Sequence, residues 1–266
     1  MSHEESSQQA ATPQVDKGLW LADVFNVLYR GCDMIMPEKQ IGTIKVSDDQ
    51  NDHYLYKVVD ADMTKSSLQQ IDEQLMLNGP EISSISAEDS LKIDVDLFCG
   101  AFKDTLYIDD CPSDDSIETD SPLEIKIVSE DGKGEIYLLY AIFDNAVEAH
   151  LEVKLFATFE VYGCIAASTS KIEVPGYAHM LFLERPYSKT KAGPLNPPNL
   201  LLHSKSVVAV PLESELLVDI HLMRGDEVDI HEGTVSFVAK RTGISTKVVR
   251  GAKWKIELEI CWKCGT

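Results

Sequence analysis

Clustered carboxylates are the residues whose types and spacing come closest to a binding site in this chain. Asp48, Asp49 and Asp52 form one group. The second group lies in a serine- and proline-containing stretch and consists of Asp109, Asp110, Asp114 and Asp115. Calcium takes roughly six to eight oxygen ligands, which loops at one end of a β-sandwich can supply. Neither group has EF-hand spacing, so a solvated acidic rim is the simpler interpretation.

One compact segment combines basic and aromatic side chains. Its members are Arg185, Tyr187, Lys189 and Lys191. The segment precedes a proline-rich stretch, Pro194–Pro198, and such a loop can dock a partner protein or an acidic surface. The alternative is a long exposed connection between strands. These four residues and the second aspartate group are the candidate partner-binding loops.

The cysteines and histidines do not form a recognisable reaction centre. Cys261 and Cys264 make a C-x-x-C pair, but one pair without a second pair or a helix start makes neither a zinc site nor a redox site. We expect free thiols, and the role of this pair stays open. The seven histidines are scattered, and motifs of phosphate-binding loops, hydrolase elbows and zinc proteases are missing. We therefore expect no catalytic residues, metal or cofactor.

The charge of the chain is unevenly distributed. Residues 18–145 hold 27 acidic and 9 basic residues, a net of −18, whereas residues 146–266 hold 14 of each. The acidic half disfavours nucleic-acid binding. No apolar run approaches the length of a membrane span, and residues 1–13 lack the basic and apolar blocks of a signal peptide. We expect a cytoplasmic protein, with the nucleus as an alternative, and a tail without a packed core at 1–17.

Two stretches with a period of two predict the strands around which the fold is organised. In Ser90–Phe98, four apolar residues alternate with Lys92, Asp94 and Asp96, and Glu215–Met223 repeats the pattern. Such alternation places apolar side chains on one face of a strand and polar ones on the other. No long amphipathic helix is visible, although 63–74 suits either a short helix or a loop. The sequence therefore predicts an all-β protein.

The second half of the chain retraces the first at an offset near 125 residues. The matches besides the two organising strands are 22–29 with 149–156, 41–44 with 162–165, 53–56 with 179–182, and 75–77 with 200–202. We predict two similar antiparallel β-sandwich-like repeats, tandem or fused, related by a pseudo-twofold axis. The first spans 18–145 and the second spans 146–266, with Asn145 in a turn. Trp254 and Trp262 are predicted core anchors.

Several of these segments resemble a plant family of unknown function, found mainly in cereals. It occurs alone and as the C-terminal half of jasmonate-induced ribosome-inactivating proteins. Leu75–Pro80 is similar to the family's L-x-L-T-G-P, Ser204–Val210 to its S-R-x-V-V-A-V, and Ala252–Leu258 to its closing strand. The resemblance covers about residues 18–263 and implies a link to stress or defence. The E-A-x-R helix of the N-glycosidase half is absent, so depurination is not implied.

From these observations we expect a non-enzymatic module that binds a protein partner in a plant stress or defence response. One alternative is a calcium- or phospholipid-responsive sandwich of C2-like character, suggested by the acidic loops. The other is a glycan-binding or uncharacterised hydrolytic protein. Neither the partner nor the oligomeric state follows from the sequence, and a homo-oligomer is compatible with it.

Overall fold

The computed structural model is built from antiparallel strands, and its described residues contain no helix. The described residues are 18–30, 42–49, 51–58, 74–75, 77, 80, 83–98, 101–108, 118–132, 134–159, 161–184, 199–224 and 229–263. The predicted tail and the ambiguous segment 63–74 lie outside them, except Gln74 in β4. The strands run in chain order as β1 (Leu19–Arg30), β2 (Gly42–Ser47), β3 (Asp52–Val58), β4 (Gln74–Leu75), β5 (Ile85–Ser86), β6 (Leu91–Leu97), β7 (Phe102–Ile108), β8 (Leu123–Val128), β9 (Glu135–Ala157), β10 (Val161–Thr169), β11 (His179–Glu184), β12 (Asn199–Pro211), β13 (Glu215–Arg224), β14 (Asp229–Val238), β15 (Thr242–Arg250) and β16 (Trp254–Lys263).

The first half packs two sheets face to face. A four-stranded sheet, β3-β2-β6-β7, covers the part of an eight-stranded sheet that contains β4, β1, β9 and β8. Ile44 and Val95 from the smaller sheet share one buried cluster with Val24 and Leu138 from the larger one. The strict alternation predicted for β6 is confirmed, because every second residue of Leu91–Leu97 is buried.

The second half has the same strand order. Its smaller sheet is β11-β10-β13-β14, and it covers β12, β9, β16 and β15 of the eight-stranded sheet. The segments that the sequence offset pairs occupy corresponding places, β13 with β6 and β10 with β2 among them. Trp262 is buried in this core, and Trp254 packs partly buried against it. The matching order fits a duplicated unit, and superposition of the halves stays a prediction.

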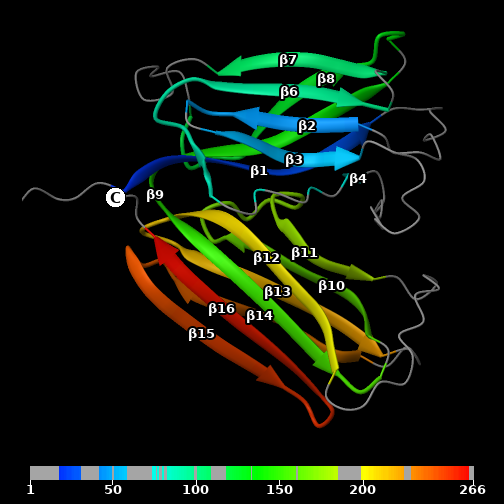
Figure 1. Cartoon of the computed structure of the whole chain (residues 1–266), viewed down its shortest axis with the longest axis vertical. Helices are drawn as coiled ribbons and strands as arrows, with labels where there is room; N and C mark the ends of the chain where they lie inside the picture. The colour runs from blue at the N-terminus through cyan, green and yellow to red at the C-terminus, as the bar shows by residue number, and fades with distance from the viewer. Residues whose placement is uncertain are drawn as a thin grey trace, which may run out of the picture.

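Strand β9 crosses the predicted boundary between the halves. It runs without interruption over 23 residues, pairing with β1 and β8 at its start and with β12 and β16 at its end. Figure 1 shows it passing from the upper sandwich into the lower. The turn predicted at Asn145 is therefore wrong. The Asn145 side chain accepts a hydrogen bond from the backbone N–H of Gly18 at 2.7 Å. The pairing of β9 with β1 shifts register between the buried residues Phe143 and Ala146, and the chain does not reverse there.

A third buried cluster joins the halves. Phe25 and Phe143 meet Ile172 and Tyr177 of the second half there, with the rings of Phe25 and Tyr177 5.5 Å apart in an edge-to-face arrangement. The Tyr177 hydroxyl donates to the Leu123 carbonyl at 2.9 Å. Because one strand and one core are shared, the sandwiches form a continuous body.

Candidate functional site

The predicted partner-binding loops lie outside the described residues. This applies to all eight of their residues: Arg185, Tyr187, Lys189, Lys191, Asp109, Asp110, Asp114 and Asp115. Cys264 lies outside them as well. The structure does not test these predictions. The candidate sites described below lie on sheet faces and edges within the described residues.

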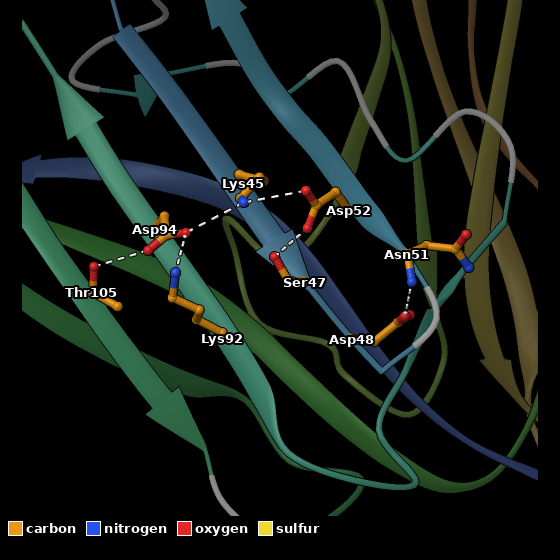
Figure 2. A network of polar contacts seen from close by, with 8 residues as sticks. All are labelled: Lys45, Ser47, Asp48, Asn51, Asp52, Lys92, Asp94 and Thr105. Atoms are coloured by element: carbon orange, nitrogen blue, oxygen red, sulfur yellow. Dashed lines mark hydrogen bonds and ion pairs between the residues drawn. The ribbon is translucent and has the colours of Figure 1, made fainter.

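The outward face of the β3-β2-β6-β7 sheet carries a network of alternating charges (Figure 2). Asp94 on β6 is its centre and accepts hydrogen bonds from Lys92 Nζ at 2.8 Å and from the Thr105 hydroxyl at 2.9 Å. The Nζ of Lys45 on β2 lies 3.6 Å from Oδ2 of Asp94 and 3.3 Å from Oδ2 of Asp52. Antiparallel register places Lys45 directly between Asp94 and Tyr54 on its neighbouring strands.

This network shifts its carboxyl groups toward the charged form. Hydrogen bonding from Lys92, then from Thr105, together with the charges of Lys92 and Lys45, holds the pKa of Asp94 below its ordinary value against the opposing effect of burial. Hydrogen bonds from Ser47 and Lys45 lower the pKa of Asp52 in the same way. Acids and bases thus pair across the face, an arrangement in which opposite charges on neighbouring strands hold those strands together.

The first acidic loop is divided between structural and solvent-facing carboxylates. Asp48 turns inward, where its oxygens meet the His53 ring at 3.0 Å and the backbone N–H groups of Asn51 and Ser86 at 2.7 and 3.0 Å. Asp49 instead faces Asp89, and their shared hydrogen bond and mutual repulsion raise the pKa of Asp49. Within the described ranges, no three potential metal ligands of the His, Cys, Asp or Glu types converge.

The second half keeps one element of this network and loses the rest. Asp219 occupies on β13 the place of Asp94, and it accepts the Thr234 hydroxyl at 2.6 Å. The residues at the places of Lys45 and Lys92 are Ala166 and Leu217. The outward face of β11-β10-β13-β14 is therefore less charged around its aspartate than the face drawn in Figure 2.

Three histidines lie against carboxylates, a pairing that we did not predict from the sequence. Besides His53 with Asp48, His179 Nε2 lies 2.7 Å from Asp23, and both side chains are almost fully buried. The ring N–H of His179 is not aligned for a hydrogen bond, so the contact is one of proximity. Asp23 is also held by the backbone N–H of Ala209 at 3.1 Å. The one available signal was that the 53–56 and 179–182 matches each begin with histidine.

The third pair lies on the outward face of β9. His150 Nε2 is 2.9 Å from Glu148, whose other oxygen accepts both the hydroxyl and the backbone N–H of Ser84. Burial disfavours the charged form of Glu148, but the hydrogen bonds from Ser84 and His150 outweigh it, so its pKa lies below the ordinary value. Cys261 is the cross-strand neighbour of His150, and it is a half-buried free thiol.

Three exposed aliphatic side chains of the second half lie on its edge strands β14 and β15. Ile244 is 65% exposed and Val248 45% on strand β15, and Val238, at the end of β14, is 61% exposed. Among the described strands, β15 ends the eight-stranded sheet and is paired with β16 alone. An exposed edge of this length is a template for pairing with another chain.

Comparison with known proteins decides the family. A family model described as "Domain of unknown function (DUF6598)" matches residues 24–260. The chain belongs to this family. Membership in the DUF6598 family agrees with the predicted resemblance to a family of unknown function, whereas cereal origin and the link to ribosome-inactivating proteins stay predictions. No curated protein matches the chain.

Among solved structures, this DUF6598 chain is similar to a structure of the two tandem C2 domains of Extended-Synaptotagmin 2, with 10% identity, a TM-score of 0.26, and coverage of 100% of this chain and 98% of the other. It is also similar to a human GIVD cytosolic phospholipase A2, with 10% identity, a TM-score of 0.26 and coverage of 94% and 33%. Similarity at this level carries no argument about function. Within the described residues no helix is long and apolar enough to cross a membrane.

Proposed function

We propose that this DUF6598 protein is a non-enzymatic interaction module whose shared-strand scaffold presents the β15 edge to a protein partner. The observation that supports it most directly is the exposure of Ile244 and Val248 on a terminal strand of nine residues. Edge strands of soluble proteins are usually short, charged or covered, because an open ladder recruits other chains. An edge that keeps two exposed aliphatic residues is better explained by a partner than by solubility.

The described polar clusters support the same conclusion. Each of the three histidine–carboxylate pairs has a carboxylate that also holds backbone N–H groups, of Ser86, Ala209 or Ser84. Each carboxylate thereby ties together two segments of the chain, which is a structural use of groups that an enzyme would keep accessible. The scaffold is therefore suited to holding a binding edge in a fixed position.

The cellular setting of the proposal rests on the sequence resemblance. A plant stress or defence response, in the cytoplasm or nucleus, is the setting that this resemblance implies. The excess of 27 acidic over 9 basic residues in 18–145 supports a partner other than nucleic acid.

Affinity purification from stressed plant tissue tests the proposed function. Tagged full-length chain is compared with an Ile244→Lys/Val248→Lys variant, and with Val174→Lys as a control that alters an exposed aliphatic residue elsewhere. We expect stoichiometric partners to be retained by the wild type and the control and lost from the double variant. Retention of every partner by the double variant, or purification of the wild type alone, contradicts the proposal.

A calcium-responsive role is a second candidate, favoured by one observation. Asp49 and Asp89 approach closely enough to raise the pKa of Asp49, and a divalent cation would relieve that repulsion. Calcium titration calorimetry of the wild type and of Asp49→Asn tests this role. Heat that disappears in the variant supports it, and the absence of heat in the wild type removes it.

A further inference from the structure

We propose that the β15 edge takes an acidic, extended segment of its partner as an additional strand of the eight-stranded sheet. This inference rests on the proposed function and specifies the chemistry of the partner. Strand addition uses backbone hydrogen bonds for affinity and alternating side chains for specificity. Three observations carry it: the open ladder of β15, the side chains on its two faces, and the charge around it.

The outer edge of β15 lacks the contacts that hold its counterpart in the first half near both ends. In the first half, β8 occupies the corresponding position, and its first residue, Leu123, has its carbonyl bound by the Tyr177 hydroxyl. Just beyond β8, the backbone N–H of Glu130 donates to the Ala101 carbonyl at 3.1 Å. No residue of Thr242–Arg250 has a backbone hydrogen bond to a neighbour other than β16 in the described part of the chain. The described contacts thus tie β8 to the fold near its two ends, whereas none of this kind is present along β15 in the described residues.

The two faces of β15 differ in chemistry. Ser245 and Lys247 lie opposite the buried Ile260 and Leu258 and so point toward the sandwich interior, where Ser245 accepts the Trp262 indole N–H at 2.9 Å. Lys247 bonds to the Ser236 carbonyl and lies over the Phe237 ring. Ile244 and Val248 point to the opposite, outward face. An added strand would therefore place apolar side chains beside this outward pair and acidic ones beside Lys247.

The charge around β15 selects an acidic partner. Residues 240–263 contain seven basic and two acidic residues, in a chain whose formal net charge is −20. The basic residues are Lys240, Arg241, Lys247, Arg250, Lys253, Lys255 and Lys263. A second copy pairing through its own β15 would bring these like charges together, which costs free energy across an interface. An acidic segment is attracted by the same charges, and its binding should weaken as salt is added.

The experiment uses the full-length protein and synthetic peptides of about nine residues, a length suited to one strand. One peptide alternates Val and Glu, and its control alternates Val and Lys. Binding is followed by fluorescence anisotropy of the labelled peptide, and the location by hydrogen exchange of the protein. The variant Lys247→Glu tests the charge beside the expected acidic side chains, and Lys103→Glu on edge strand β7 is its matched control.

We expect the Val/Glu peptide to bind, to protect amides within 242–250, and to lose affinity about fivefold or more in Lys247→Glu but not in Lys103→Glu. N-methylation of alternate peptide amides blocks one edge of an extended strand at a time. Methylation on the Val residues and on the Glu residues should therefore differ, one set abolishing binding and the other preserving it.

Equal binding of both peptides, equal effects of both methylation patterns, or protection outside 242–250 would overturn the inference. Concentration-dependent dimerisation with protection of 242–250 would also overturn it, in favour of a second copy. If the Val/Glu peptide fails while tissue partners still depend on Ile244 and Val248, the interaction function stands and the strand chemistry is wrong. If no such partners exist either, the proposed function fails independently.

Discussion

Asp94 and Asp219 occupy matching places in the two halves, and each accepts a hydrogen bond from a threonine on the next strand. Asp94 is flanked by Lys92 and Lys45, whereas leucine and alanine stand at the corresponding places around Asp219. The shared bond belongs to the strand framework that both halves need. The charges around it are free to differ, so the halves differ at their surfaces while they share a topology.

The backbone supplies a second matching feature beneath the different surfaces. Gly42 on β2 and Gly163 on β10 both have positive φ angles, 157° and 121°. A Cβ at Gly42 would lie 2.4 Å from the Asp96 carbonyl oxygen, and one at Gly163 would lie 2.1 Å from that of His221. Both carbonyls belong to the organising strands, β6 and β13. Close approach of backbone to backbone thus explains why glycine stands at both places.

The largest effect is expected from truncating equivalent core residues. Leu97 on β6 and Leu222 on β13 are fully buried, and replacing either by alanine should lower the free energy of unfolding by about 2–5 kcal/mol. Because β9 belongs to both sandwiches, each variant should still unfold in one transition. Urea denaturation measures both quantities, with fluorescence of one variant that keeps only Trp20 reporting on the first half and of another that keeps only Trp254 reporting on the second. Two separate transitions would show that the halves are independent.

The glycine pair should rank next. Gly163→Ala should lower the free energy of unfolding by about 1–3 kcal/mol, because of backbone strain and the clash with His221. Gly42→Ala should lower it less, because the φ of Gly42 lies closer to the extended region. Thermal unfolding of both variants tests the order. Gly132→Ala is the control, since its φ is also positive, at 71°, while a Cβ there would meet no neighbour within 4 Å. If Gly132→Ala costs as much as Gly163→Ala, the clash is not the cause.

Glu148 tests the connection between the halves through pH. Its pKa is lowered in the folded protein, so the stability it contributes is present above the unfolded value near 4.5 and is lost as the pH falls through the lower folded value. Glu148→Gln should therefore be destabilised by about 1–3 kcal/mol at neutral pH and approach the wild type in acid. Chemical denaturation between neutral pH and the acid limit measures the difference. A difference that does not shrink in acid excludes the charge as its origin.

The strands of the core could be predicted from the sequence because burial alternates locally. In β6 and β13 the period of two is visible in adjacent residues, and the structure buries the apolar positions as expected. The repeat was visible for the same reason, since the matches preserve chain order. The turn predicted at Asn145 is wrong because the Asn145 side chain accepts a hydrogen bond from Gly18, which lies far away in the sequence. This contact takes the place of the turn that asparagine favours.

The candidate site could not be predicted because it depends on which strands become neighbours. Asp23 and His179 are brought together by packing between the halves, and no local spacing encodes that contact. The openness of β15 has the same origin, because Ile244 and Val248 read as an ordinary strand until the pairing shows that β15 is terminal. Residue types indicate a strand, but its place in a sheet is a property of the complete fold.

The smallest effect is expected where the two halves differ most, at the outward aspartates. The pKa of Asp94 is lowered in the folded protein, chiefly by the hydrogen bond from Lys92. The stability that Asp94 contributes is therefore present above its ordinary pKa of 3.8 and is lost as the pH falls through the lower pKa of the folded state. Because the side chain is 30% exposed, Asp94→Asn should cost only about 0–1 kcal/mol at neutral pH. Added salt should reduce that cost for Asp94→Asn and leave Asp219→Asn unchanged, because screening acts on ion pairs more than on the shared threonine bond. Equal salt dependence of the two variants would mean that the lysines around Asp94 contribute no measurable stability. The two outward faces would then differ in composition but not in their contribution to the free energy of unfolding.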